Sequence, residues 1–308
     1  MTSAQRWLQT RSLHHGAYPA ERLAVERDGT VSVCVPARDC ASTIAEIVDS
    51  LIALRDAGAI DQVVVIDGAS TDGTGDLAVA AGAEVHADSD LLPAQGPVLG
   101  KGDAMWRSLS VLTGDVVCFV DGDTTGFSDR FACGLVGPLV CGDGVDFVKA
   151  AYRRPFTVGE LSVPDAGGRV SQLCARPLLA MFYPELAAIR QPLSGEIAAR
   201  RDLLERLPFA TGYAVEIAML IDVYREIGLR RIAQVDLDER INEHQTLDAL
   251  VPMAFAVLQV VTDRLEREGR LIGVEPGDLL MSAADGPAPH AVELIERPPL
   301  VSLGAARA

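Results

Sequence analysis

The segment 116–123 reads Val-Val-Cys-Phe-Val-Asp-Gly-Asp, five apolar residues followed by two carboxylates around a glycine. A short apolar run that ends in a turn predicts a buried strand, here Val116 to Val120. Two carboxylates at the end of such a strand, Asp121 and Asp123, can hold a hard divalent cation that neutralises a diphosphate. We therefore predict that this strand ends at a ligand-binding edge and that Asp121 and Asp123 bind a metal or a ribose.

Similar strands lie upstream and alternate with helical patterns. Val31 to Val35 is an apolar run that Pro36 is expected to end, and Gln62 to Ile66 is a β-branched run leading into Asp67-Gly68. The other expected elements are a helix opened by Ser42 and ended by Gly58, a helix at 77–81, a strand at 84–86 and a helix at 103–112. This alternation predicts an α/β fold with a doubly wound, mostly parallel sheet whose ligands lie at the carboxyl ends of the strands.

The second half is less regular but continues the same architecture. We expect a strand at 145–151, an edge strand at 232–237, and helices at 172–181, 213–227 and 247–267. The predicted organisation is an N-terminal extension at 1–30, packed against the body, an α/β half at 31–130, a second half at 131–284 and a tail at 285–308.

Composition narrows the class of ligand. The 308 residues carry 43 acidic and 27 basic side chains, a net charge of −16, which disfavours non-specific binding to nucleic acid or anionic lipid. Six scattered cysteines without a CxxC pair are expected to be reduced, and no apolar run reaches the length of a membrane span. A cytoplasmic protein with a small ligand is expected, and any anionic ligand needs a local basic cluster.

Two glycine-rich segments offer such cations. Gly100-Lys101-Gly102 precedes a predicted helix and suits a phosphate or a nucleobase edge, although an exposed lysine in a turn explains it equally well. Gly167-Gly168-Arg169 presents a guanidinium to an anionic ligand or to one of the many carboxylates of the chain. Glu216, on an amphipathic helix, is either buried with a partner or turned to the rim.

Two further features have simpler explanations. Asp236-Leu237-Asp238 repeats the DxD pattern, but on an alternating, half-exposed segment, so we do not expect it to bind metal. The adjacent His14 and His15 are expected to be solvated, and His244 by itself is best explained as a surface histidine.

Several strings together resemble one family. VPARDCASTI, VVVIDGASTDGT, GKGDAMWRSL, VCFVDGD, GGRVSQLCARPLL, QPLSGEIAARR and GYAVEIAMLID are similar to the retaining GT-A glycosyltransferases typified by glucosyl-3-phosphoglycerate synthase. The similarity spans about residues 31–250, and GGRV, RPLL and PLSGE are specific to that family. It implies a GT-A fold with a nucleotide-sugar-binding first half, an acceptor-binding second half and a metal-dependent retaining hexosyltransferase activity.

The resemblance also implies roles for residues. Donor binding falls to Pro36, Ala37, Arg38, Asp67, Gly68, Lys101, Asp121, Gly122 and Asp123. Acceptor binding falls to Gly168, Arg169, Ser171 and His244, and the carbonyl of Leu193 would face the anomeric carbon. We take Asp123, Leu193 and Glu216 as the candidate catalytic residues. The cofactor is Mg²⁺ or Mn²⁺, held by Asp123 with His244 or Asn242, and a homodimer is expected.

The chain departs from the family at two places. Asp39-Cys40 stands where Asn-Glu is usual, and Asn242 stands where the metal-binding histidine is usual, with His244 two residues later. Either the loop shifts so that His244 binds the metal, or metal binding is weaker. An antibiotic-pathway enzyme that joins a guanosine-diphosphate sugar to a thiol such as ergothioneine is therefore an alternative, and a non-catalytic nucleotide-sugar-binding relative is a second.

Overall fold

A computed structural model describes residues 3–142, 144–158, 161–163, 167–241, 245–272, 279–281, 289–291 and 294–304. Its helices are α1 (Ser3–Arg11), α2 (Ala20–Glu26), α3 (Ile44–Asp56), α4 (Thr74–Ala80), α5 (Lys101–Ser108), α6 (Asp129–Val140), α7 (Arg176–Phe182), α8 (Arg201–Arg206), α9 (Val215–Ile227) and α10 (Leu247–Arg267). The main sheet contains β1 (Ser12–His14), β2 (Val31–Ala37), β3 (Gln62–Asp67), β4 (Glu84–Ala87), β5 (Val116–Phe119), β6 (Phe147–Arg153), β9 (Ile197–Arg200) and β11 (Ile232–Glu239). Three two-stranded ribbons add β7 (Phe156–Val158), β8 (Leu161–Val163), β10 (Phe209–Ala210), β12 (Leu279–Met281), β13 (Pro289–Ala291) and β14 (Glu296–Arg297).

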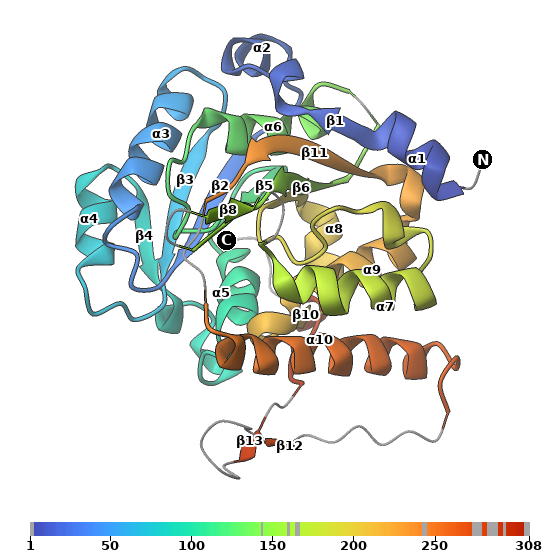
Figure 1. Ribbon diagram of the computed structural model, residues 1–308. Coiled ribbons are helices and arrows are strands. Elements are labelled where there is room, and N and C mark those ends of the chain that lie inside the picture. Colours follow the sequence, from blue (N-terminus) through green and yellow to red (C-terminus); the bar gives the residue numbers. More distant parts are fainter. Residues whose placement is uncertain are drawn as a thin grey trace.

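The eight strands follow the order β1-β11-β6-β9-β5-β2-β3-β4. All neighbours are parallel except β9, which runs antiparallel to both β5 and β6. Strands from both halves of the sequence therefore form one sheet, as the mostly parallel prediction requires. Helices cover both faces of this sheet, and α10 lies across the outer side of the layer formed by α5, α7 and α9 (Figure 1).

Alternate strand residues supply two hydrophobic cores. In β3, Val64 and Ile66 join the core on the α5 and α9 face, whereas Val63 and Val65 join the core on the α3 and α6 face. Successive side chains of a strand point to opposite faces, so a strand buried on both sides needs a continuous apolar run. This explains why the strands could be recognised from unbroken runs of Val, Ile and Cys.

Two strand predictions need correction. β2 does not stop at Pro36 but continues to Ala37. Proline has no backbone N–H to donate, but the pairing of β2 with β5 ends at Cys34, so no hydrogen bond from Pro36 is required on that side. β11 is not an edge strand, because β1 pairs with it in parallel and places Leu13 opposite Val235.

The N-terminal extension is packed against the body, as predicted. The indole of Trp7 is buried and its Nε1 donates a hydrogen bond of 2.8 Å to the carbonyl of Ile232. The predicted helices are present with shifted ends: α5 begins at Lys101 and ends at Ser108, and the helix expected over 172–181 starts with a wide turn at Ser171–Ala175. Helix α6 and strand β9 were not predicted.

All six cysteines are free thiols, and four of them are buried. Among the described residues, no helix combines the length and apolar character needed to cross a membrane.

Candidate active site

One edge of the sheet collects most of the predicted site residues. β2, β3, β5 and β6 are parallel, so their carboxyl ends lie at the same edge. β9 runs in the opposite direction, with Ile197 opposite Phe119, so the segment that precedes it reaches that same edge. The Asp121-Gly122-Asp123 loop and the 191–196 turn therefore lie side by side.

Arg240, which follows β11, binds the carboxylates of the loop after β5. Its guanidinium is 3.0 Å from Asp121 Oδ2 and 2.9 Å from Asp123 Oδ1. It also lies 2.8 Å from Oε1 of the buried Glu196. Surrounding carboxylates raise the pKa of Arg240 despite its burial. Asp123 is 67% exposed and thus remains open to a ligand, whereas Asp121 is largely covered.

Lys101 lies on the other side of Asp121. Its Nζ is 2.5 Å from Asp121 Oδ1 and 3.0 Å from Oε1 of Glu216, in the first turn of α9. Burial favours the neutral forms, but the attraction between these groups dominates: the pKa of Lys101 is raised and that of Asp121 is lowered. Glu216 is thus largely covered and paired with Lys101, which is close to the first of the two arrangements expected.

The 191–196 turn is held from beneath by β6. Lys149 Nζ donates to the carbonyl of Ser194 at 2.5 Å, and Gln191 Nε2 donates to the carbonyl of Tyr152 at 3.0 Å. The Tyr152 hydroxyl donates to Glu196 Oε2 at 2.9 Å. Burial lowers the pKa of Lys149 to about 8 and raises that of Tyr152 to about 12. This buried network orients the turn that carries Leu193.

Gly195 allows the turn to approach the ion pair closely. A Cβ built on Gly195 would lie 2.2 Å from Asp121 Oδ1 and 2.3 Å from Lys101 Nζ. Ordinary van der Waals contacts of a Cβ begin at 3.4 Å. No other residue type fits there without displacing Asp121 and Lys101.

A cavity of about 410 Å³ opens in front of these groups. Asp123, Leu193, Gly168, Arg169 and Ser171 all line it. A guanidinium N–H of Arg169 donates to the carbonyl of Gln245, which also lines the cavity. Two of the three candidate catalytic residues, Asp123 and Leu193, therefore meet the predicted acceptor loop in one hollow, whereas Glu216 is not among the residues that line it.

The predicted nucleoside-binding residues lie at the ends of β2 and β3. Ala37 is opposite Asp67, and Gly68 N donates to the Ala37 carbonyl at 2.8 Å. Pro36 and Asp67 are half-buried, and Arg38 is exposed without an ion-pair partner among the described residues. Gly122 lies against this group, since a Cβ on it would be 3.1 Å from Ala37 Cβ.

Asp39 and Cys40, the first of the two places where the resemblance implies a departure, also line the cavity. Asp39 has a φ of +52° and its carboxylate accepts a hydrogen bond from Thr71 N at 2.8 Å, which joins the loops after β2 and β3. Cys40 is buried, and burial raises the pKa of its thiol. A positive φ outside glycine is costly and occurs most often in functional loops.

Asn242 and His244 lie outside the described residues. The described chain enters that segment at Ile241, which forms an antiparallel bridge with Thr125, two residues after Asp123. Ile241, the last described residue before that segment, therefore lies beside the candidate metal-binding loop.

Sequence reasoning missed four residues of the site: Lys149, Tyr152, Glu196 and Arg240. Glu196 lay within the quoted PLSGE string without a role. Arg240 could have been noticed as a cation two residues after the second DxD segment, but its partners depend on where β11 ends relative to β5.

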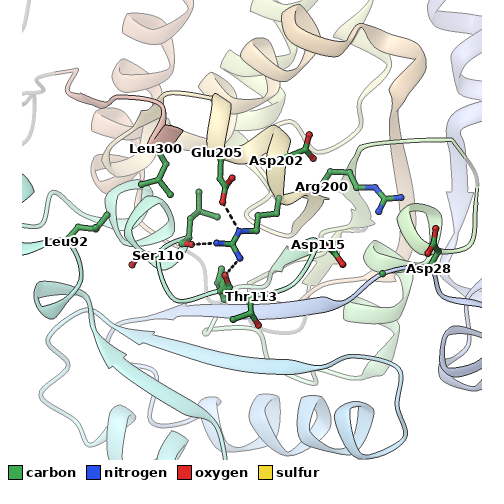
Figure 2. A pocket seen from close by; sticks show the side chains of 13 residues that line it. Asp28, Leu92, Ser110, Thr113, Asp115, Arg200, Asp202, Glu205 and Leu300 are labelled. Atoms are coloured by element: carbon green, nitrogen blue, oxygen red, sulfur yellow. Dashed lines mark hydrogen bonds and ion pairs between the residues drawn. The ribbon is translucent and has the colours of Figure 1, made fainter. Parts of the chain in front are cut away.

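A larger cavity, of about 760 Å³, lies at the opposite edge of the sheet, where β2 and β5 begin (Figure 2). Asp28, Asp115, Arg200 and Asp202 line it, together with Glu205. None of the predicted site residues that the structure describes lines it. Its Arg201 is fully engaged, with Nε 2.8 Å from Glu205 Oε1 and the two terminal nitrogens donating to the carbonyls of Leu109 and Leu112.

Comparisons with known proteins match both the sequence and the fold. The model described as glycosyl transferase family 2 matches residues 32–145. Glucosyl-3-phosphoglycerate synthase from Mycolicibacterium paratuberculosis is 41% identical, covering 96% of this chain and 92% of that protein. The synthase of the same name from Petrotoga mobilis is 39% identical, covering 95% and 94%.

Two solved structures are similar over nearly the whole chain. Mannosyl-3-phosphoglycerate synthase from Rubrobacter xylanophilus has a TM-score of 0.88 at 43% identity, covering 97% of this chain and 99% of that one. Glucosyl-3-phosphoglycerate synthase from Mycobacterium tuberculosis, solved with Mn²⁺, UDP-glucose and phosphoglyceric acid, has a TM-score of 0.79 at 41% identity, covering 92% and 94%. These similarities confirm the predicted GT-A fold.

Proposed function

Because the chain belongs to the glucosyl-3-phosphoglycerate synthase family of glycosyltransferases, we propose that it transfers a hexosyl group from a nucleoside-diphosphate sugar to 3-phosphoglycerate with retention of configuration. The observation that carries this proposal is the cavity on which Asp123, Leu193 and Arg169 meet. In this proposal Asp123 serves the leaving group, the turn at Leu193 faces the sugar and Arg169 binds the acceptor, and the three residues line one hollow.

The donor lies across the strand ends in this proposal. The nucleoside occupies the ends of β2 and β3, where Ala37, Asp67 and Gly68 approach one another, and Arg38 is available to its phosphates or base. The diphosphate lies toward Asp121 and Asp123. Ligand binding at the carboxyl ends of strands is general for open α/β sheets.

A divalent cation fits the oxygen donors at this edge. Mg²⁺ and Mn²⁺ prefer carboxylate oxygens, and Asp123 presents one that is largely exposed to the cavity, beside the more buried Asp121. When bound, the cation supplies positive charge to the leaving diphosphate. Asn242 and His244 are the further candidate ligands, and comparing Asn242→Ala with His244→Ala for the metal concentration needed for turnover identifies which one contributes.

Arg240 and Lys101 prepare the site for the anionic donor. Without donor, Arg240 forms ion pairs with Asp121, Asp123 and Glu196, and on donor binding its contact with Asp123 is exchanged for phosphate oxygens. Lys101 stays between Asp121 and Glu216, which makes Glu216 a positioning residue. Preorganised cations of this kind stabilise charge that develops on a leaving group without reorganisation.

Transfer proceeds on one face of the sugar. The bond between the anomeric carbon and the diphosphate oxygen breaks, the acceptor oxygen forms its bond on the same face, and its proton passes to the leaving diphosphate. Leu193 faces the anomeric carbon in this proposal. It is held in place because Lys149 Nζ donates a hydrogen bond to the carbonyl of the next residue, Ser194. Ser171 and the backbone at Gly168 line the acceptor side with Arg169, whose planar guanidinium suits a carboxylate or phosphate.

The solved mannosyl relative makes a mannosyl donor the second candidate, because its similarity covers 97% of this chain. The compared relatives do not support the thiol acceptor, which stays an alternative for the same assay. A homodimer and a cytoplasmic location also stay predictions. Light scattering on the purified chain tests the first.

The test is a matrix of donors and acceptors. Purified protein with Mn²⁺ is incubated with UDP-glucose, GDP-glucose or GDP-mannose, each with 3-phosphoglycerate or ergothioneine, and both nucleoside diphosphate and glycosylated product are quantified. We expect UDP-glucose with 3-phosphoglycerate to give the highest kcat/KM and an α-linked product by NMR. A product of inverted configuration, or a thioglycoside formed faster than the phosphoglycerate product, would refute the proposal. Absence of turnover with every pair would favour the non-catalytic relative.

A further inference from the structure

Two features that appeared unrelated in the sequence meet in the structure. His14 and His15 lie at the end of β1, and Asp238 lies near the end of β11, 223 residues from His15. His15 Nε2 is 2.7 Å from Asp238 Oδ2, and His14 Nε2 is 3.4 Å from Asp238 Oδ1. One ligand atom from each residue can be chosen so that all three lie within 4.8 Å of one another.

His14 is the last residue of β1, His15 follows it directly, and Asp238 belongs to β11. Asp238 has a φ of +67° at the irregularity of β11 between Asp236 and Glu239. His15 packs against α6 at Gly134, where a Cβ would lie 3.0 Å from the His15 Cβ. The two imidazole rings are 4.4 Å apart between centroids. The cluster is thus fixed by strand register and by a close helix approach.

We propose that His14, His15 and Asp238 form a binding site for a divalent transition-metal ion, separate from the candidate cation site at Asp121 and Asp123. Two imidazole nitrogens and one carboxylate favour Zn²⁺, Co²⁺, Ni²⁺ or Cu²⁺ over Mg²⁺ and Mn²⁺, which prefer oxygen ligands. Three protein ligands leave a coordination position for water. The net charge of −16 also favours cation binding.

The surrounding groups leave the carboxylate available. Among the described residues, the Asp238 carboxylate contacts the two imidazoles, and the nearby cations bind elsewhere: Arg190 contacts Asp236 at 2.7 Å, and Arg130 donates to the carbonyls of Leu237 and Glu239. Gly16 N donates to His14 Nδ1 at 3.0 Å, so the proton of neutral His14 is on Nε2. Metal binding at Nε2 would move that proton to Nδ1 and replace the hydrogen bond from Gly16 by the bond to the metal.

The bound ion would crosslink two parts of the chain. It ties β1, the terminal strand of the sheet, to the end of β11, two residues before Arg240. The proposed role is therefore structural, and it is independent of the transfer reaction.

The test uses the full chain freed of metal with a chelator and titrated with Zn²⁺ or Co²⁺, followed by calorimetry and by the visible spectrum of Co²⁺. Four variants are compared with wild type: His15→Ala, Asp238→Asn, Asp123→Ala and the matched control His86→Ala. His86 also lies 2.7 Å from a carboxylate, that of Glu84, but belongs to no such cluster of described residues. Asp238→Asn keeps a side chain that tolerates positive φ, so it preserves the fold.

We expect one tight Zn²⁺ site in wild type, Asp123→Ala and His86→Ala, with an increase in Tm on Zn²⁺ binding. Loss of a residue that only supports a metal ligand typically raises the Kd for the metal roughly 10- to 100-fold. In His15→Ala and Asp238→Asn a ligand itself is changed, so the Kd for Zn²⁺ should rise by at least this factor. The increase in Tm on addition of Zn²⁺ should vanish in both variants. Unchanged affinity in either of these two variants overturns the proposal. Loss of the site in Asp123→Ala or His86→Ala overturns it as well, because the ion then binds elsewhere.

Discussion

Gly195→Ala separates the geometry of the active site from the stability of the fold. The added methyl would lie 2.2 Å from Asp121 Oδ1 and 2.3 Å from Lys101 Nζ, so both atoms must retreat by more than 1 Å to reach ordinary contact at 3.4 Å. Gly195 is not among the glycines with positive φ, so alanine is compatible with its backbone. The cost therefore falls on two side-chain ends rather than on the main chain.

The displaced groups are those proposed to bind the donor diphosphate. A misplacement of about 1 Å in a catalytic site can cost roughly 100-fold in rate, equivalent to about 2.7 kcal/mol of transition-state stabilisation. We expect kcat/KM for UDP-glucose to fall by about that factor, while Tm changes by only a few degrees. The assay is coupled release of nucleoside diphosphate, with thermal unfolding measured on the same samples.

Gly137→Ala is the matched control. Gly137 lies on α6, outside the cavity, and a Cβ there would lie 2.2 Å from the ring of Tyr18. The substitution should therefore lower stability and leave the kcat/KM of the folded fraction unchanged. Activity of Gly195→Ala within threefold of wild type, with its fold intact, would refute the placement of the diphosphate beside Asp121 and Lys101.

The other predictions concern three side chains. Asp123→Ala should reduce the rate of transfer at least 100-fold at saturating donor and metal. Its Tm should stay almost unchanged, because Arg240 keeps its other carboxylate partners. Activity within threefold of wild type would contradict the metal role. Lys149→Met should raise the free energy of unfolding at pH 7 by on the order of 2 kcal/mol, because a buried amine costs stability, and should lower kcat about tenfold by loosening the turn. In the folded chain the pKa of Lys149 is about 8, below its usual 10.5, so between these pH values the unfolded chain holds more protons than the folded chain. The free energy of unfolding of the wild type therefore increases as the pH rises through this window. The stability advantage of Lys149→Met over the wild type, measured by urea unfolding, should accordingly shrink between pH 7 and pH 9. Arg169→Lys should raise the KM for 3-phosphoglycerate strongly and leave donor hydrolysis unchanged, and equal acceptor KM values in the two proteins would remove the arginine from the acceptor site.

The strand ends of the site could be predicted from sequence because each strand and the polar residues that follow it form one continuous stretch of the chain. A buried parallel strand needs an unbroken apolar run, and the polar residue that ends it marks the binding edge. Asp67, Asp121 and Asp123 follow such runs directly. Lys101 and the arginine loop were recognisable from flanking glycines, although their partners were not.

The remaining residues could not be predicted because their roles depend on strand order. β9 is four residues long and half alanine, so it carries little strand signal, yet its antiparallel insertion places the 191–196 turn beside Asp121. Arg240 reaches the carboxylates only because β11 ends at the same edge as β5. The contact of His15 with Asp238 likewise needs β1 to pair with β11, which no local pattern indicates.

The covering of β11 by β1 protects one edge of the sheet from pairing with a strand of another molecule. Residues 12–14 occupy the hydrogen-bonding side of a strand whose residues 232–237 are mostly apolar and buried, and Trp7 anchors this cover at the carbonyl of Ile232. If the first fourteen residues were removed, that side of β11 would be a long, open and apolar edge, which readily accepts a strand from another molecule. The same exposure makes exchange of β1 between two copies a low-cost route to a swapped dimer, since each copy would regain the pairing that it gave up.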